Sequence, residues 1–341
     1  MERRDHTERD GVLAVEDLSV GFVQQETRTV LSRVSLSIRR GETVGLVGES
    51  GCGKSTLGRA VMRLLPANAA VEGSIRLLGE DVLANDDRAM RRLRGGVVAM
   101  IFQNPMSALN PVLTIGRQIT EVLETHTGLR GRAAMARAIE LLHTVGIDRP
   151  GDRVHDYPHQ FSGGMRQRAM IAMAISCDPK LLIADEPTTA LDVTVQAQIL
   201  DLVASLQENL SMAMLFISHD MSAVASVADR IAVMYAGRIV EQGVAGPLLR
   251  DPAHPYTFGL LNSVPHVDGA RHARLHAIPG SVSAGSAGAA GCSFRSRCRF
   301  SVANCATEMP PLADIGGGRA ARCWLASAHW RPAADSWSVA P

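Results

Sequence analysis

The chain has 341 residues, of which 46% are hydrophobic and 20% are charged, and its formal net charge is +1. This balance is ordinary for a globular protein and gives no case for a nucleic-acid binder or a membrane-surface binder. The longest apolar runs, such as "MAMLFI" from Met212, fall far short of the about 18 residues that a membrane span needs.

The N-terminal tail, residues 1–11, is charged and lacks the apolar centre of a secretory signal. We therefore expect the chain to stay in the cytosol unless a partner holds it at a membrane. In that compartment the six cysteines are expected to be thiols or metal ligands before disulfides.

Short strands are expected within residues 12–47, where "VLAVEDLSV" and "ETVGLV" carry β-branched residues. The stretch "GESGCGKST" follows from Gly48, matches the pattern GxxxxGK[ST], and precedes the helical spacing of "TLGRAVMRLL". This order of strand, loop and helix is the context in which the pattern forms a phosphate-binding loop. The alternative interpretation is a chance glycine-rich turn.

The chemistry of such a loop rests on its backbone. Glycines let N–H groups converge on phosphate oxygens, and the start of the following helix adds partial positive charge. Lys54 is expected to reach the β- and γ-phosphates, and Ser55 to place its hydroxyl on Mg²⁺. The predicted phosphate-binding residues are Gly48, Ser50, Gly51, Gly53, Lys54, Ser55 and Thr56.

Further strands are expected at 72–78 and 97–102, and from about 111 to 175 the pattern turns helical. The segments "LLIAD", "AMLFIS" and "RIAVMY" then return as short apolar strands, with the helical "VQAQILDLVASLQENL" between the first two. The sequence therefore predicts an α/β fold whose parallel core is interrupted by a helical insert.

The apolar run "LLIADEP" delivers Asp185 and Glu186 at its end. Asp185 is expected to hold the Mg²⁺ shell, directly or through water, and Glu186 to polarise an attacking water as a general base. Alone, such a run is as readily a plain strand end. The phosphate loop that precedes it in the chain favours the catalytic interpretation.

Four more stretches resemble the motifs of ATP-binding-cassette (ABC) ATPases: "IFQNP" (101–105) their Q-loop, "FSGGMRQR" (161–168) their signature sequence, "TALDV" (189–193) their D-loop and "ISHD" (217–220) their switch histidine. The resemblance implies a P-loop NTPase core with an antiparallel β subdomain and a helical subdomain. It also implies that such cassettes dimerise, each ATP lying between one subunit's phosphate loop and the other's signature.

The resemblance also implies individual roles. Gln103 would sense Mg²⁺ and the γ-phosphate, and His219 would contact the γ-phosphate and orient water with Glu186. Asp192 would line the subunit interface, and Phe22 would stack on adenine, with a core position as the alternative for this lone aromatic. The residues expected to bind the γ-phosphate of ATP on the opposite subunit are Ser162, Gly163 and Gly164. The signature departs from the family pattern at Met165, but the backbone donors before it are intact.

The C-terminal third indicates which branch of the ABC ATPases this chain resembles. "DPAHPYTFGLLNSVP" (251–265) resembles the His-Pro-Tyr segment of peptide and nickel importers, with a plain amphipathic helix as the alternative. The small-residue stretch 280–291 is expected to be a linker before a cysteine segment, 292–325, and a tail, 326–341. The resemblance thus implies an ATPase domain at 12–250, an extension at 251–279, and an ATP-hydrolysing subunit for import of dipeptides or oligopeptides.

The same branch implies the partners: a second ABC ATPase as a heterodimer, two permease chains and an extracytoplasmic substrate-binding protein. Three other functions stay open, namely import of nickel or another small solute, a soluble cassette protein not coupled to transport, and a subunit that binds ATP without hydrolysing it.

The tail holds the spacing C-x5-C-x6-C-x17-C, which is unlike the C-x2-C pairs of common zinc ribbons. Four thiolates suit tetrahedral Zn²⁺ or a 4Fe–4S cluster, and disulfides or free thiols are a third alternative. The resemblance favours the cluster as a structural staple, and neighbouring arginines would offset its negative charge. The predicted ligands are Cys292, Cys298, Cys305 and Cys323, and the predicted cationic neighbours are Arg295, Arg297, Arg299 and Arg322.

Overall fold

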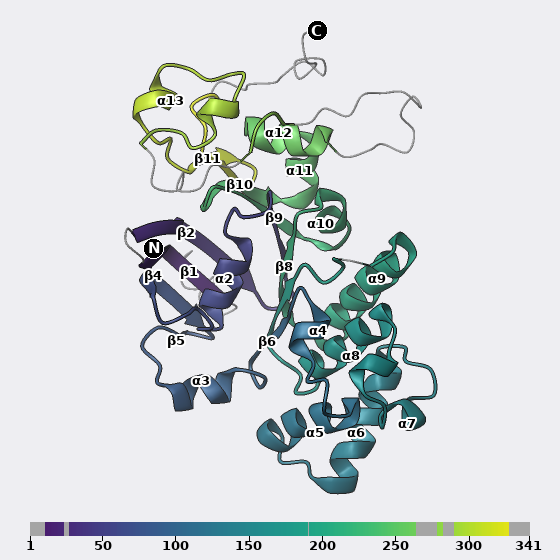
Figure 1. Cartoon of the computed structure of the whole chain (residues 1–341). Helices are drawn as coiled ribbons and strands as arrows, with labels where there is room; N and C mark the ends of the chain where they lie inside the picture. Colours follow the sequence, from purple (N-terminus) through teal and green to yellow (C-terminus); the bar gives the residue numbers. More distant parts are fainter. Residues whose placement is uncertain (1–10, 24–26, 190, 264–277, 282–289, 327–341) are drawn as a thin grey trace. The chain divides into compact units, whose positions relative to one another are not determined.

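The structure is a computed structural model and describes residues 11–23, 27–189, 191–263, 278–281 and 290–326 (Figure 1). The expected N-terminal tail up to residue 10, most of the expected linker and nearly all of the expected C-terminal tail lie outside the described residues. By its internal contacts the chain divides into two compact units, which are described in turn. The first comprises 1–13, 37–43 and 76–217, and the second comprises 14–36, 44–75 and 218–341.

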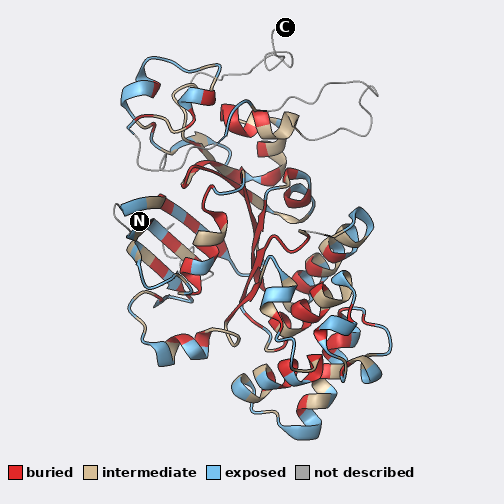
Figure 2. Ribbon diagram, in the orientation of Figure 1, coloured by how far each residue is buried: buried red, intermediate tan, exposed pale blue. Residues whose placement is uncertain are grey.

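The core of the first unit is a run of parallel strands: β6 (Val98–Ile101), β7 (Leu181–Asp185) and β8 (Ala213–Ser218). Every residue of the three strands is buried (Figure 2). Continuous apolar runs of this kind are what parallel strands covered on both faces require. Because parallel strands end at the same edge of a sheet, the residues that follow β7 are presented there.

Helices make up most of the rest of the first unit (Figure 1). Three of them, α5 (Ile115–His126), α6 (Gly131–Thr144) and α8 (Gly163–Ile175), pack against one another, as the helical pattern of the sequence predicts. Its remaining elements are β5 (Glu80–Asp81), α3 (Asp87–Leu93), α4 (Pro105–Ala108), α7 (Pro150–Arg153), the 3₁₀ turn η1 (Pro158–Gln160) and α9 (Val193–Leu210).

In the second unit, β3 (Thr43–Val47) pairs in parallel with β9 (Arg230–Tyr235), and β9 pairs antiparallel with β10 (Arg238–Val244). The helix α2 (Lys54–Val61) follows β3 after the glycine loop. The strand, loop and helix that the phosphate-binding pattern requires are therefore all present.

The N-terminal strands are longer than the sequence predicts. Here β1 (Gly11–Val23) and β2 (Thr27–Arg39) are 13 residues each, and β1 lies between β2 and β4 (Ala69–Leu77). Asp17 and Arg33 have positive φ values of 47° and 50°. Such residues break the alternation of apolar and polar positions without ending a strand, so each long strand looks like two short ones in the sequence.

The C-terminal part adds strands to the second unit. The pair β11 (Ala313–Gly316) and β12 (Arg319–Ala321) is antiparallel, and β12 pairs with β10 through Glu241 and Gln242. The segment that contains the cysteines is thereby hydrogen-bonded to the sheet, beyond what the expected linker suggests. The other elements are α10 (Met221–Val227), α11 (Ala245–Arg250), α12 (Pro255–Asn262), η3 (Arg295–Arg297) and α13 (Asn304–Thr307). None of the described helices is both long enough and apolar enough to cross a membrane.

Candidate nucleotide-binding and hydrolysis site

The phosphate loop of the second unit depends on two glycines that no other residue could replace without movement. A Cβ on Gly48 would lie 2.1 Å from the carbonyl oxygen of Met234. Gly53 has a φ of 107°, and a Cβ there would lie 2.6 Å from a methyl group of Leu31. The loop is therefore closed tightly against its surroundings, which leaves backbone N–H groups as its accessible donors.

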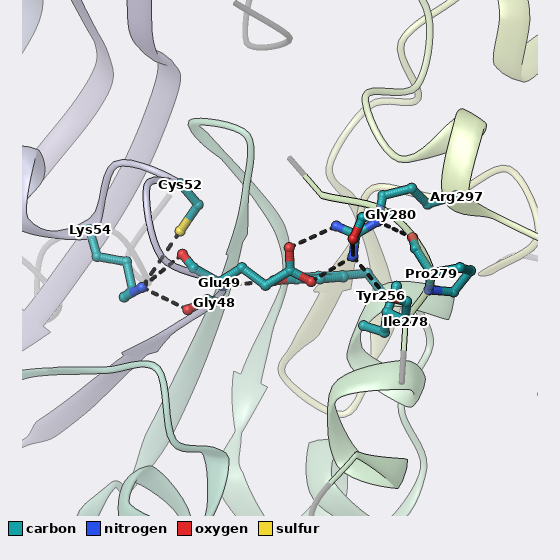
Figure 3. A network of polar contacts seen from close by, with 9 residues as sticks. All are labelled: Gly48, Glu49, Cys52, Lys54, Tyr256, Ile278, Pro279, Gly280 and Arg297. Atoms are coloured by element: carbon teal, nitrogen blue, oxygen red, sulfur yellow. Dashed lines mark hydrogen bonds and ion pairs between the residues drawn. The ribbon is translucent and has the colours of Figure 1, made fainter. Parts of the chain in front are cut away.

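Lys54 begins α2 and is buried, with 4% of its surface exposed. Its Nζ donates to the carbonyl oxygens of Gly48, at 2.6 Å, and Glu49, at 3.0 Å (Figure 3). No acidic side chain lies in the first turn of α2. A buried cation at a helix N-terminus beside a glycine loop fits a polyanion, so the residues present fit a nucleotide triphosphate.

Cys52 lies inside this loop and is 1% exposed. Burial raises the pKa of its thiol, and the charge of Lys54 only partly opposes that rise. The thiol therefore stays protonated and unreactive at neutral pH.

The acidic pair lies in the first unit, at the tip of β7. Asp185 is 2% exposed and pairs with Ile217 of β8. Glu186 follows with a φ of 49°, a left-handed conformation that is uncommon for a glutamate and that recurs at active sites. Its backbone N–H donates to the carbonyl of Ile217 at 2.9 Å, which fixes the turn.

The carboxylate of Glu186 is held by two donors. Gln103 Nε2 and Thr189 Oγ1 each donate to its Oε2, both at 2.8 Å. The structure thus brings together two predicted residues 83 positions apart, and it adds Thr189, which the sequence analysis did not single out. Thr189 begins the stretch "TALDV" that resembles a D-loop, but that resemblance does not indicate a hydrogen bond to Glu186.

The predicted signature residues begin α8. Ser162 is its N-cap, and the Ser162 hydroxyl accepts a hydrogen bond from the backbone N–H of Met165 at 3.3 Å. Ser162 and Gly163 are exposed and Gly164 is half-buried. A long helix that starts with an exposed serine and an exposed glycine leaves its first N–H groups accessible, as an anion site requires. Met165 does not disturb this start, because the helix uses only its backbone.

Three other predicted residues lie at helix starts or strand ends. Asp192 caps α9 by accepting from the N–H of Val195 at 3.0 Å. His219 is exposed directly after β8, and Phe22 is half-buried near the end of β1 and is not part of the core. The phosphate loop, His219 and Phe22 belong to the second unit, while the carboxylates, Gln103 and the signature belong to the first.

The four tail cysteines lie around one cavity of the second unit, together with the aromatic rings of Phe294, Phe300 and Trp324. Burial raises the pKa of Cys298 to about 12 and that of Cys323 to about 11, and backbone hydrogen bonds to these sulfurs oppose the rise. Backbone donors to sulfur are typical of thiolate ligands. Among the described residues, however, no group of three or more His, Cys, Asp or Glu side chains is arranged so that it could hold a metal ion.

The cationic neighbours expected around these cysteines have other partners. Arg322 donates to the carbonyls of Ile239 and Pro310, and Arg295 donates to the carbonyl of Ala306. Arg297 forms an ion pair with Glu49. Burial explains the carbonyl and carboxylate partners of Arg297. Exposed Arg295 lines the same cavity as the four cysteines; burial raises the pKa of Cys292, and the charge of Arg295 opposes that rise.

Solved structures support this interpretation of the fold. The chain is similar to a dimeric ATP-binding cassette in a post-hydrolysis state bound to ADP and Pi, with 26% identity, a TM-score of 0.61 and coverage of 68% of this chain and 98% of that one. It is also similar to cbiO1 from Clostridium perfringens, part of the ABC transporter complex cbiONQ, at 26% identity, a TM-score of 0.61 and coverage of 71% and 92%. The fold and the site together define an ATP-binding cassette, a P-loop ATPase.

Family models refine the assignment. Residues 31–189 match the ABC transporter model, and residues 240–305 match the model of the oligopeptide/dipeptide transporter C-terminal region. A probable peptide ABC transporter ATP-binding protein of Sinorhizobium fredii is 47% identical over 95% of this chain and 98% of its own length. A putative peptide import ATP-binding protein of Brucella abortus is 48% identical over 92% and 97%. The chain belongs to the ATP-binding proteins of ABC transporters, in the branch that carries the oligopeptide/dipeptide C-terminal region.

Proposed function

We propose that this chain hydrolyses ATP to power import of dipeptides or oligopeptides through separate permease subunits. The observation that carries the cargo class is the match of residues 240–305 to the oligopeptide/dipeptide region, together with the relatives named for peptide import. The same region is tightly built in the structure. Buried Glu241 accepts from the N–H groups of Ala253 and His254, and His254 accepts from the N–H of Tyr256.

In the proposed hydrolysis, Glu186 takes a proton from a water as the water oxygen bonds to the γ-phosphorus, and the bond to the bridging oxygen of ADP breaks. Lys54 and the loop N–H groups neutralise the phosphates, and His219 contacts the γ-phosphate and orients the water together with Glu186. Bound Mg²⁺, held by Ser55, Asp185 and Gln103, would supply charge neutralisation at the same oxygens.

The remaining nucleotide contacts complete this proposal. Phe22, half-buried and outside the core, would stack on adenine. The exposed start of α8 would bind the γ-phosphate of ATP held by a second ATPase chain, and exposed Asp192 would line that interface. Because ATP touches both chains in the closed dimer, it binds that state more tightly than the open one and so closes the dimer, and hydrolysis reopens it. We propose that the second chain is a related ATPase, giving a heterodimer.

The transport partners are two permease chains and an extracytoplasmic substrate-binding protein, with this chain peripheral at the cytoplasmic face of the membrane. Support comes from exposed apolar side chains just after Gln103. Met106 is 53% exposed and Val112 is 75% exposed. Large apolar groups this exposed are typical of a surface that a partner covers.

The proposed domain organisation is an ATPase domain at 12–250 with a helical subdomain at about 111–175, an extension at 251–279 and a cysteine segment at 292–325. The helices α5, α6 and α8 support the helical subdomain. The pairing of β12 with β10 supports close attachment of the cysteine segment to the ATPase domain.

We also propose that Cys292, Cys298, Cys305 and Cys323 hold a 4Fe–4S cluster, with Zn²⁺ as the alternative occupant. Support comes from the cavity that all four line and from the backbone donors to Cys298 and Cys323. Among the described residues the thiols are not arranged as a metal site, so binding of the cluster would have to draw the four sulfurs together. A bound cluster would supply four covalent links across a short segment, which stabilises its fold. Protein purified without oxygen should absorb broadly at about 400 nm, and C298S should lose that band. Colourless wild-type protein that contains stoichiometric zinc would contradict the proposed 4Fe–4S cluster.

The test of cargo is uptake of labelled dipeptides and of labelled nickel by cells that carry or lack this chain. We expect the deletion to abolish dipeptide uptake, E186Q to fail to restore it, and nickel uptake to stay unchanged. Loss of nickel uptake with normal dipeptide uptake would contradict the proposed cargo. Restoration by E186Q would contradict the hydrolytic role.

A further inference from the structure

Arg297 and Glu49 form a bidentate ion pair, although they lie 248 positions apart in the chain (Figure 3). Arg297 Nη1 donates to Glu49 Oε2 at 2.7 Å, and Nη2 donates to Oε1 at 3.0 Å. Glu49 is the second residue of the phosphate loop, and Arg297 directly precedes Cys298 of the cysteine segment. The pair therefore joins the C-terminal segment to the nucleotide site within one compact unit.

Arg297 is held rigidly for this contact. Its Nε donates to the carbonyl of Pro279 at 2.8 Å, and its Nη2 donates also to the carbonyls of Ile278 and Gly280. Its side chain is only 7% exposed, against 27% for Glu49. A guanidinium this well buried and this fully bonded has one orientation, so it can hold the carboxylate of Glu49 in one place.

A second contact holds the backbone of the same residue. The N–H of Glu49 donates to the hydroxyl of Tyr256 at 2.9 Å (Figure 3). Tyr256 is fully buried, and its ring packs against Tyr235 and Phe294 with centroids 4.7 and 5.4 Å apart. Burial raises the pKa of Tyr256, so the hydroxyl stays neutral in the whole physiological range.

Glu49 thus has all three of its polar parts engaged: its N–H by Tyr256, its side chain by Arg297 and its carbonyl by the ammonium of Lys54. This matters for phosphate binding because a carboxylate in a phosphate loop adds negative charge next to a polyanion. Repulsion between such charges is strong where water is partly excluded and is cancelled when a cation is fixed beside the carboxylate.

We propose that Arg297 and Tyr256 are positioning residues of the ATP site: Arg297 neutralises and orients Glu49, and Tyr256 fixes the first turn of the phosphate loop. This inference rests on the ATPase assignment and extends it by making the C-terminal segment part of nucleotide binding. Because η3 ends at Arg297 and Cys298 follows, the packing of the cysteine segment sets where this guanidinium lies.

The experiment is a titration of the purified full chain with ATP in the presence of Mg²⁺, which needs neither permease nor cargo. We expect R297A to weaken ATP affinity by about tenfold, because the phosphate loop then carries an unpaired negative charge close to the bound phosphates. The double variant E49Q/R297A should return to within about threefold of wild type, because the repelling charge is gone. R250A removes the same charge from an exposed position of the same unit, outside the cysteine segment, and should leave ATP affinity unchanged.

The salt dependence of ATP affinity distinguishes the proposed electrostatic role of Arg297 from a purely structural one. Raising the ionic strength from about 0.05 M to about 0.5 M should shrink the R297A defect, because salt screens the repulsion from Glu49. Y256F keeps the ring packing and removes only the hydroxyl, so it should fold normally and still weaken ATP binding by severalfold. ATP affinity within twofold of wild type for Y256F, or a salt-independent R297A defect that E49Q does not relieve, would overturn the proposal. Both outcomes are independent of whether the cargo is a peptide.

Discussion

Gln103 donates from its side-chain amide to the carboxylate of Glu186 at 2.8 Å, and Thr189 donates to the same oxygen. The residue expected to sense the nucleotide and the residue expected to act as base are therefore directly bonded. The carboxylate also sits on a turn with a left-handed φ of 49°. Its orientation is thus set by strain and by two hydrogen bonds, which is how a catalytic group is preorganised.

E186Q should bind ATP as wild type does but lose turnover by about 10²–10⁴-fold, because an amide cannot accept the proton of the attacking water. The amide oxygen can still accept from Gln103 and Thr189, so the turn should persist. Steady-state ATPase assays and ATP binding by titration test the two halves of this prediction.

The matched control is E140Q, since Glu140 is exposed and forms an ion pair with Arg137 on the helix surface. Its turnover should equal that of wild type. Turnover of E186Q within threefold of E140Q would refute the base assignment.

G48A should abolish ATP binding, because its new Cβ would meet the backbone carbonyl of Met234 at 2.1 Å and force the loop open. The matched control is G41A, where φ is 68° but no heavy atom lies within 4 Å of the added Cβ. G41A should cost about 1 kcal/mol of stability through backbone strain alone and leave ATP affinity intact. Equal ATP affinity for G48A and wild type would show that the close packing of the loop is dispensable.

S162A should lower stability by about 1 kcal/mol, because α8 loses its N-cap hydroxyl. It should also weaken ATP-dependent association of ATPase chains, since the same residue begins the proposed γ-phosphate contact. D86A removes the comparable N-cap of α3 and should lower stability without changing association. Thermal unfolding measures the effect on stability. Sedimentation with ATP, in the E186Q background, measures the effect on association. ATP-dependent association of S162A equal to that of the control would contradict the proposed place of α8 in the interface.

His254 should make the protein less stable as pH falls. It is 2% exposed, and burial, aided by the charge of Arg322, lowers its pKa to about 3. The native state then keeps His254 neutral while the unfolded chain protonates it below about pH 6.5. Because the unfolded state binds more protons between these values, this residue lowers stability by at most about 1.4 kcal/mol per pH unit as pH falls from 6.5 towards 3.

H254N isolates this effect, because an asparagine can still cap α12 but does not titrate. We expect H254N to be less stable than wild type at about pH 7.5 through lost packing, with the gap closing towards about pH 5. Glu241 contributes the opposite slope, since burial raises its pKa, but it is present in both proteins and cancels. Urea unfolding at each pH gives the difference, and a gap that stays constant would contradict a neutral His254.

Local patterns predicted much of this protein because they depend on neighbours in the chain. The phosphate loop requires glycines and a lysine at fixed spacing before a helix, and Gly53 and Lys54 are at that boundary. The buried strand β7 ends at Asp185, where its apolar run ends. The serine cap at Ser162 follows from a serine directly before a helical stretch that opens with two glycines.

Other features could not be found this way. Asp17 and Arg33 hide the true length of β1 and β2, because a positive φ leaves no pattern in the sequence. Glu49 occupies a variable position of the loop pattern, and nothing near it indicates Arg297. Two of the arginines expected beside the cysteines have partners that no pattern indicated: Arg297 is bonded to Glu49, and Arg322 donates to the carbonyl of Ile239, because a guanidinium takes whichever acceptors the fold brings to it.

The amino-acid sequence by itself determined that this chain is an ABC ATPase, because phosphate chemistry demands particular residues at short, fixed separations. Only the tertiary structure decided that the C-terminal segment reaches the phosphate loop. Tyr256 and Arg297 meet Glu49 across more than 200 positions. Contacts at that separation arise from how strands and loops pack, and packing leaves no spacing rule for a sequence to reveal.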